Sequence, residues 1–384
     1  MKRMYTISFA VAVLALLGIG IFFAWKSKLF DRNYITIAVV GPINGVSKRG
    51  NAIWNGVSLC IDEINEQGGI DGRQIKLLAF DDGDDRRLAI QKAEEIAENR
   101  EINLVLGNNL SSTSIAAGRI YKKKGIPAIT ASASSVSVTK NNEWFFRVSS
   151  NTAFSGKYIA NFMAKNLKTK KASILFDKNS VGSSLSRNFE SQANNLGIEI
   201  VKKWSFDSEK IKTDGNASKL DVEIQKVVSE VLSTQDPGMI FLSMLNSESV
   251  KVLKYLRSSG IKHQVFIGDE FSAESFRMFQ EFPKERAILG YYSNGVYAVT
   301  PFLTDVANKE AKVFIKKYKE KYGVEPSWHA ASYYDAALAA VKAIRNAEIV
   351  DITKTKLSRL LIKKALQNID NHEKSIEGVT KRIY

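Results

Sequence analysis

The sequence has few of the residues on which covalent cross-links and metal sites depend. It contains one cysteine, Cys60, and only three histidines among 384 residues. A single cysteine excludes an intrachain disulfide, and the histidines lack the spacing of metal ligands. The sequence therefore predicts no metal site, and nothing in it indicates a cofactor.

The motifs of several common enzyme classes are missing as well. The loop Gly41-Pro-Ile-Asn-Gly45 lacks the glycine spacing of phosphate-binding and dinucleotide-binding loops, and no Gly-x-Ser-x-Gly elbow occurs. The acidic run Asp81-Asp-Gly-Asp-Asp85 is not followed by calcium-loop spacing, so we interpret Asp84 or Asp85 as the cap of the next helix. These absences favour a protein that is not an enzyme and has no catalytic residues.

Basic residues are abundant, because the formal net charge is +15. The lysines are scattered over predicted helix faces, as at 316–321, and no basic stripe is interleaved with aromatic residues. This pattern argues against nucleic-acid binding, whereas attraction to an anionic membrane surface fits such a chain.

One long apolar run, residues 7–25, follows Lys2 and Arg3 and is long enough to cross a bilayer as a helix. Bulky residues, Phe22-Phe-Ala-Trp25, stand where a signal peptidase needs small ones, so the run favours an uncleaved signal anchor over a cleaved signal peptide. We expect residues 1–33 to form a cytoplasmic stub, a membrane helix and a linker, with the rest outside the cytoplasm. Positive charges on both sides leave the orientation open.

From residue 34 the chain alternates between strand and helix patterns. A first series has predicted strands at 35–40, 75–80, 102–106 and 128–130, with helices at 51–66, 89–99 and up to 123. A second series has strands at 172–176, 199–204, 239–243 and 264–267, with helices at 155–167, 183–195, 219–232 and 247–259. Helices at 304–322, 329–347 and 353–367 follow. Such alternation predicts an α/β fold of two doubly wound parallel-sheet lobes.

Hydroxyl residues gather at the ends of two neighbouring predicted strands. The segment 108–114 includes Ser111 and Ser112, and the segment 130–137 includes Ser132 and Ser134. Ligands of open α/β sheets bind where carboxyl ends of strands meet helix N-termini, whose free N–H groups accept a carboxylate. The alternative is that each serine caps its own helix. Two clusters on adjacent strands favour a shared ligand site.

In the second half, Ile267-Gly-Asp-Glu270 ends a predicted strand with two carboxylates. Asp269 or Glu270 could bind a ligand ammonium across from the serines. Exposure beside a turn is an equally good interpretation of this segment.

The order of motifs resembles that of the type I periplasmic binding proteins, in their leucine/isoleucine/valine-binding branch. The matching segments include Ile37-Ala-Val-Val-Gly-Pro-Ile-Asn-Gly45, Ile64-Asn-Glu-Gln-Gly-Gly-Ile-Asp-Gly72, Gly107 to Ser114, Tyr322-Gly-Val-Glu-Pro326 and Ala331-Ser-Tyr-Tyr-Asp-Ala336. The resemblance runs from about residue 34 to the end. It implies two lobes joined by a three-crossover hinge: 34–149 with 291–376, and 150–290 with 377–384.

The resemblance also implies roles for individual residues. Ser111, Ser134 and the backbone of Ser132 would hold the carboxylate and ammonium of an amino acid, and Glu270 would bind the ammonium from the second lobe. Ser112, Asp269 and Asn44 of the first loop are further candidates. The pattern departs at three positions, where aromatic or tyrosine side chains are replaced by Arg49, Val181 and Leu245. These departures put aliphatic specificity in question, and Arg49 could favour an acidic or polar ligand.

These expectations together describe a membrane-anchored, extracytoplasmic solute-binding protein for ABC-type uptake. It would capture an amino acid or related small amide between its lobes and dock on a permease. A ligand-sensing ectodomain with a membrane signalling partner is the alternative. A hydrolase using the serine-rich cleft is less favoured, because the three histidines fall away from those serines.

Overall fold

The structure is a computed structural model that describes residues 34–213, 217–268, 279–370 and 373–383. The predicted membrane segment 7–25 and the candidates Asp269 and Glu270 lie outside the described residues. Among the helices that are described, none combines the length and the apolar character needed to span a bilayer.

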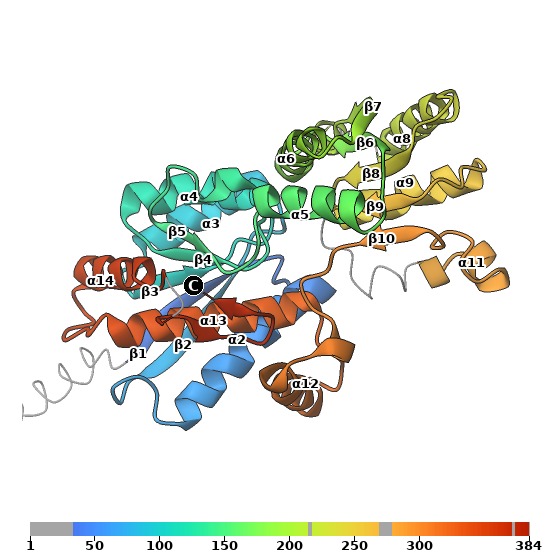
Figure 1. Cartoon of the computed structure of the whole chain (residues 1–384). Coiled ribbons are helices and arrows are strands. Elements are labelled where there is room, and N and C mark those ends of the chain that lie inside the picture. The colour runs from blue at the N-terminus through green and yellow to red at the C-terminus, as the bar shows by residue number, and fades with distance from the viewer. Residues whose placement is uncertain (1–33, 214–216, 269–278, 371–372, 384) are drawn as a thin grey trace, which may run out of the picture.

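The first lobe is built on a five-stranded sheet in the order β2-β1-β3-β4-β5, in which every pair is parallel. Its strands are β1 (Tyr34–Gly41), β2 (Gln74–Asp81), β3 (Ile102–Leu106), β4 (Ala128–Thr130) and β5 (Phe145–Arg147). Between them run α2 (Lys48–Glu66), α3 (Arg86–Glu98), α4 (Ser111–Lys124) and the short η1 (Val136–Val138). Figure 1 shows this lobe in blue to teal.

The second lobe repeats this architecture with a parallel sheet in the order β10-β9-β8-β6-β7. Its strands are β6 (Lys171–Asp177), β7 (Glu199–Phe206), β8 (Met239–Ser243), β9 (Val265–Ile267) and β10 (Val296–Ala298). Its helices are α5 (Thr152–Lys165), α6 (Ser180–Asn195), α7 (Ser208–Thr213), α8 (Ala217–Leu232), α9 (Asn246–Ser258) and α11 (Pro283–Ala287). The prediction of two parallel-sheet α/β lobes is therefore confirmed.

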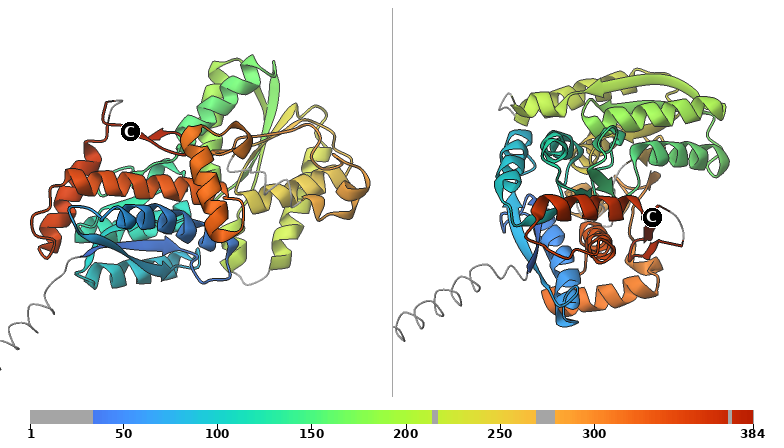
Figure 2. Two further views of the ribbon diagram at one scale, coloured as in Figure 1. Left: turned by 90° about the horizontal axis from the view of Figure 1, so that it is seen from below. Right: turned by 90° about the vertical axis from the view of Figure 1, so that its left-hand side faces the viewer.

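Both faces of the first sheet are covered. On one face lie α2, α13 (Trp328–Asn346) and α14 (Thr355–Gln367), and on the other lie α3 and α4. Helices α2 and α13 touch closely, because a Cβ at Gly56 would stand 2.2 Å from the carbonyl oxygen of Ala330. The last helices of the chain thus complete the core of the first lobe, as Figure 2 also shows.

The region between the lobes differs from the predicted boundaries at two places. The first lobe was expected to resume at residue 291, but β10 at 296–298 pairs with β9 and lies in the second sheet. Helix α12 (Lys309–Tyr322), preceded by η2 (Thr304–Val306), then packs on α2 and α13 of the first lobe. The crossover back to the first lobe therefore follows β10.

The C-terminal segment 377–384 was expected in the second lobe, but its described residues lie against the first. Strand β11 (Ile376–Glu377) pairs with β12 (Arg382–Ile383) in an antiparallel hairpin. The buried carboxylate of Asp335 in α13 accepts hydrogen bonds from the backbone N–H groups of Val379 (2.6 Å) and Thr380 (3.0 Å). Ile383 is part of the core of the first lobe. The C-terminal hairpin therefore lies on the first lobe because Asp335, which is far from it in sequence, binds its backbone.

Candidate ligand-binding site

The two hydroxyl segments meet at the carboxyl edge of the first sheet. They follow β3 and β4, which are paired neighbours. The hydroxyl of Ser111 accepts a hydrogen bond from the N–H of Ser135 at 3.0 Å, so the loop after β4 is tied to the first turn of α4. The carbonyl of the adjacent Ser134 accepts from the N–H of Thr152 at 2.8 Å, where α5 begins. The structure therefore brings Ser111 and the loop carrying Ser134 together beside the crossover between lobes.

Helix α4 starts without a side-chain cap. Its N-cap is Leu110, which offers no acceptor. The hydroxyls of the first turn bond elsewhere: Thr113 donates to the Leu110 carbonyl at 2.9 Å, and Ser114 donates to the Asn108 carbonyl at 3.1 Å. The alternative that Ser111 or Ser112 caps this helix is therefore wrong. The N–H groups of the first turn and the positive end of the helix dipole remain available to an anion.

Two other helices of the first lobe, α2 and α3, begin with a side-chain cap. Asp85 caps α3 by accepting from the N–H groups of Arg87 (2.8 Å) and Leu88 (2.9 Å), which confirms the predicted cap within the acidic run. Ser47 caps α2 by accepting from the N–H of Gly50 at 3.1 Å. The start of α4 therefore differs from the starts of α2 and α3, although α14 of the same lobe also begins without a side-chain cap.

The candidate serines have different surroundings. The hydroxyl of Ser132 lies 2.7 Å from the carbonyl oxygen of Asn109, to which it donates, and 3.2 Å from the Tyr333 hydroxyl. The side chain of Ser132 is therefore engaged in hydrogen bonds within the first lobe, and its backbone is part of the loop after β4. Ser134 is buried. Ser112 is half-buried, and its hydroxyl forms no hydrogen bond with any other residue that the structure describes.

A buried hydrogen-bonded pair, Asp82 and Asn108, joins the loops after β2 and β3 at the carboxyl edge of the first sheet. Asp82 follows β2 and is fully buried, and its carboxylate accepts a hydrogen bond from the Asn108 side-chain amide at 2.7 Å. The N–H of Asp84 also donates to this carboxylate at 3.0 Å. Burial raises the pKa of Asp82 to about 6, against the lowering effect of these hydrogen bonds. The Asn108 carbonyl in turn accepts from the Thr130 hydroxyl at 2.9 Å, which couples β2, β3 and β4.

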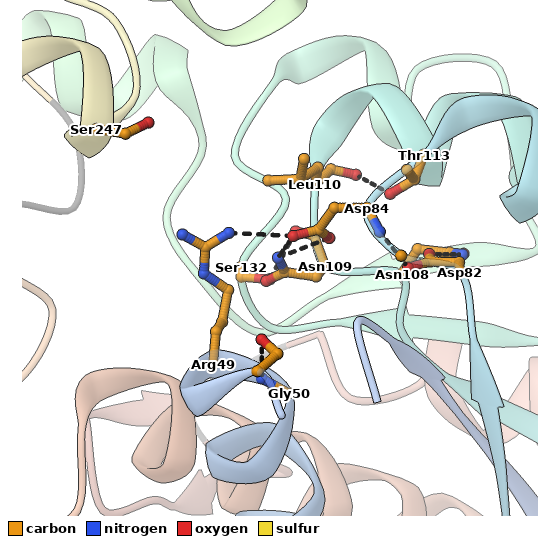
Figure 3. A network of polar contacts seen from close by, with 12 residues as sticks. Arg49, Gly50, Asp82, Asp84, Asn108, Asn109, Leu110, Thr113, Ser132 and Ser247 are labelled. Atoms are coloured by element: carbon orange, nitrogen blue, oxygen red, sulfur yellow. Dashed lines mark hydrogen bonds and ion pairs between the residues drawn. The ribbon is translucent and has the colours of Figure 1, made fainter. Parts of the chain in front are cut away.

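A second polar network lies at the surface of the same edge (Figure 3). The Arg49 guanidinium donates to the Asp84 carboxylate at 3.1 Å, and the Asn109 amide donates to both oxygens of that carboxylate at 3.0 and 3.1 Å. Asp84 has a left-handed backbone, with φ of 56°. Burial raises the pKa of Asp84, and the Asn109 amide and the Arg49 charge oppose the rise. Arg49 thus connects through Asp84 and Asn109 to Ser132.

Sequence reasoning did not single out Asp82, Asn108, Asn109 or Tyr333, and it treated Asp84 only as a possible cap. A signal for the first three was present, since Asp82 follows β2, and Asn108 and Asn109 follow β3, the two strands that flank β1. Acid and amide side chains at adjacent strand ends can pair, as they do here. Tyr333 comes from α13, and no local pattern links it to this edge.

Asn44 stands apart from these networks. It is exposed, and its side-chain oxygen accepts from the N–H groups of Val46 and Ser47, both at 3.0 Å. The asparagine therefore shapes its own turn ahead of α2. The structure does not bring it into contact with the hydroxyl segments.

Two candidate residues of the second lobe, Val181 and Leu245, lie at the starts of helices α6 and α9. Val181 is buried in the first turn of α6, where the side chain of Asn179 accepts from the N–H groups of Val181 (3.1 Å) and Gly182 (2.8 Å). Helix α9 begins after Leu245, which is half-buried and offers no side-chain cap. The first turn of α9 carries Ser247. Figure 3 shows Ser247 apart from the network of Arg49, with its hydroxyl towards the first lobe. Helices α4 and α9, one from each lobe, thus both lack side-chain caps.

The chemistry of the site is that of recognition by hydrogen bonds. Within the described part of the chain, no group of three histidine, cysteine or acidic residues could hold a metal ion. His329 is buried in the first turn of α13, and burial holds its pKa well below the usual range, so it stays neutral. N–H groups, hydroxyls and a guanidinium are suited to binding carboxylate and carbonyl oxygens.

Comparison with known proteins agrees with this architecture. A family model described as periplasmic binding protein matches residues 34–381. An amino acid binding protein of Pseudomonas aeruginosa is 31% identical over 169 residues, which cover 44% of this chain and 45% of that relative. A leucine-, isoleucine-, valine-, threonine- and alanine-binding protein of the same organism is 25% identical over 321 residues, covering 83% and 79%. The chain thus spans less than half of the first relative and about four fifths of the second.

Solved structures resemble the chain over nearly its whole length. A branched-chain amino acid transporter substrate-binding protein from Streptococcus pneumoniae, in complex with isoleucine, has a TM-score of 0.73 and 25% identity, covering 91% of each chain. A leucine-binding protein from Thermotoga maritima has a TM-score of 0.72 and 22% identity, covering 90% of each chain, and shares the fold. The chain therefore belongs to the periplasmic binding protein family, as the resemblance of its motifs predicted, and proteins named for binding leucine, isoleucine and valine are among its relatives.

Proposed function

We propose that this protein is an extracytoplasmic solute-binding protein of an ABC-type uptake system, and that its ligand is an amino acid. The first lobe holds the ligand carboxylate at the uncapped start of α4, and closure of the second lobe encloses it. Residues 7–25 anchor the protein to the membrane. The ligand is bound and released without a chemical change.

The observation that carries this proposal is the start of α4. Leu110 leaves the N–H groups of the first turn without a side-chain acceptor, and Ser111 holds the loop of Ser134 against that turn. An anion placed there receives N–H and hydroxyl hydrogen bonds together with the helix dipole. A charge-assisted hydrogen bond of this kind is about twice as strong as a neutral one.

The relatives support the amino-acid part of the proposal. Two relatives in Pseudomonas aeruginosa are named as amino-acid-binding proteins, and the Streptococcus pneumoniae structure contains isoleucine. Each of these ligands carries an α-carboxylate. The neighbours described as transporter proteins favour delivery to a permease over sensing.

A thermal-shift screen of the full chain in a mild detergent against the twenty standard amino acids tests this function. A ligand that binds only the folded protein raises the melting temperature, by an amount that grows with its concentration. We expect at least one amino acid to do so. Ser134→Ala lowers the affinity for that amino acid about 10-fold, because a hydrogen bond to a charged group is lost. The matched control Ser229→Ala, on the exposed face of α8, leaves it unchanged. A screen without any shift refutes the proposal.

Membrane attachment has a separate test. Cells that express the full chain are fractionated, and the membranes are washed with alkaline carbonate. Retention in the washed membranes supports the anchor formed by residues 7–25. Release of a shortened protein into the soluble fraction indicates cleavage and contradicts it.

A further inference from the structure

Arg49 occupies a position that determines what can lie next to a carboxylate bound at α4. Its partner Asp84 is held by the amide of Asn109, which stands directly before the helix N-cap Leu110. Arg49 therefore belongs to the wall that continues from the proposed carboxylate site. Figure 3 shows one nitrogen of its guanidinium directed at Asp84 and the other on the side where Ser247 of the second lobe lies.

The guanidinium retains most of its hydrogen-bonding capacity. An arginine has five N–H donors, and one nitrogen of Arg49 is bound to Asp84. Within the described parts of the chain, Arg49 has no other hydrogen-bond or ion-pair partner. Its side chain is 43% exposed, so the remaining donors are accessible.

The acceptor side of the same network is largely occupied. Both carboxylate oxygens of Asp84 accept from the Asn109 amide, and one of them also accepts from Arg49, while the side chain is only 18% exposed. Asp84 therefore fixes the position of the guanidinium and offers little to a ligand donor. The wall is thus rich in donors and close to neutral in charge.

The consequence for a ligand is specific. An aliphatic side chain placed against Arg49 would displace water from its free N–H donors without supplying a hydrogen-bond acceptor, which is unfavourable. A side chain that ends in a carboxylate or a carboxamide would satisfy those donors, in a planar geometry that a guanidinium matches.

Building on the proposed function, we infer that Arg49, positioned by Asp84, binds an acceptor oxygen on the ligand side chain, so that the preferred ligand is an acidic or amide amino acid. Arg49 is the specificity-determining residue, and Asp84 is a positioning residue.

Calorimetric titration of the full chain in detergent with L-glutamate, L-glutamine and L-leucine tests this inference. Glutamate or glutamine binds at least about 10-fold more tightly than leucine, because one charge-assisted hydrogen bond is gained. Arg49→Gln weakens binding of the preferred ligand about 10- to 100-fold and changes the leucine affinity by less than about 3-fold. The control Arg119→Gln, at an exposed position of α4, alters neither.

A second variant separates positioning from a merely structural role. Asp84→Asn removes the negative charge beside Arg49, so the wall gains one net positive charge. The ratio of glutamate affinity to glutamine affinity therefore rises, whatever the change in absolute affinity. Loss of stability alone would not move this ratio.

The failures of the two proposals are distinguishable. Leucine binding as tightly as both polar ligands, or an Arg49→Gln variant with unchanged affinities, overturns the inference and leaves amino-acid capture intact. If none of the twenty amino acids binds, the proposed function fails and the inference fails with it.

Discussion

Replacing Asp82 by asparagine makes a quantitative prediction about stability. Asp82 is fully buried below the carboxyl edge of the first sheet, where its two oxygens accept from the Asn108 amide and the Asp84 N–H. Burial raises its pKa from an ordinary 3.8 to about 6. At about 1.36 kcal/mol for each pKa unit, ionising Asp82 in the folded protein costs about 3 kcal/mol relative to the unfolded chain.

The direction of the pH effect follows from proton binding. Between pH 3.8 and about 6, the folded protein binds more protons at Asp82 than the unfolded chain does. Its contribution to stability is therefore complete below pH 3.8 and is lost as the pH rises through 6. Asparagine cannot ionise and does not show this loss. It offers one acceptor oxygen instead of two, so Asp82→Asn carries a constant cost of about 1 kcal/mol at every pH.

Urea unfolding of the wild-type protein and of Asp82→Asn, at several pH values from 3.5 to 7.5, measures this difference. The free energy of unfolding of the variant, minus that of the wild type, should rise by about 3 kcal/mol across the series. Asp335 titrates in the same range but is present in both proteins, so its effect cancels. A difference that stays constant with pH would refute the reasoning.

Three further changes have expected outcomes. Gly56→Ala places a Cβ 2.2 Å from the Ala330 carbonyl oxygen and should lower the free energy of unfolding by about 2–3 kcal/mol in urea titrations; an unchanged midpoint contradicts this packing. Asp335→Ala removes the acceptor that holds the C-terminal hairpin, so amide hydrogen exchange at 376–383 should become faster than in the wild type. The exposed ion pair of Arg86 and Glu209, 3.9 Å apart, joins the lobes and should show a coupling below about 0.5 kcal/mol in a double-mutant cycle.

Much of the fold was predictable because the strands are buried on both faces. Strands β3 and β8 are mostly apolar, each with one polar residue, and every residue in them is buried, while the helices between strands show clear amphipathic spacing. Two parallel-sheet lobes follow from this alternation. Of the four three-residue strands that the structure describes, β4 and β9 were predicted from their apolar character, whereas β5 and β10 were missed, because they are not fully buried and each is defined by pairing with its neighbour.

The lobe boundaries could not be predicted for the same reason. Residues 296–298 lie in the second lobe because they pair with 265–267, and the C-terminal hairpin lies on the first because Asp335 binds its backbone. Both contacts join segments that are distant in sequence. Periodicity carries no information about such pairs.

At the site, sequence reasoning located the two hydroxyl segments but not their internal bonding. The structure shows Ser111 tied to the loop of Ser134, while the roles of both in ligand binding stay predictions. The network of Arg49, Asp84 and Asn109 joins the first turn of α2 to the loops after β2 and β3, and these segments meet only in the folded chain. A charge at Arg49 was visible in the sequence, but its partner was not.

The central claim is that the start of α4 binds the α-carboxylate of the ligand. Calorimetric titration of the full chain with the amino acid that gives the largest thermal shift, and then with the α-carboxamide of the same amino acid, tests it most directly. The carboxamide lacks the negative charge but keeps the side chain and the ammonium. We expect it to bind at least about 100-fold more weakly. Equal affinity for the two compounds would contradict the account.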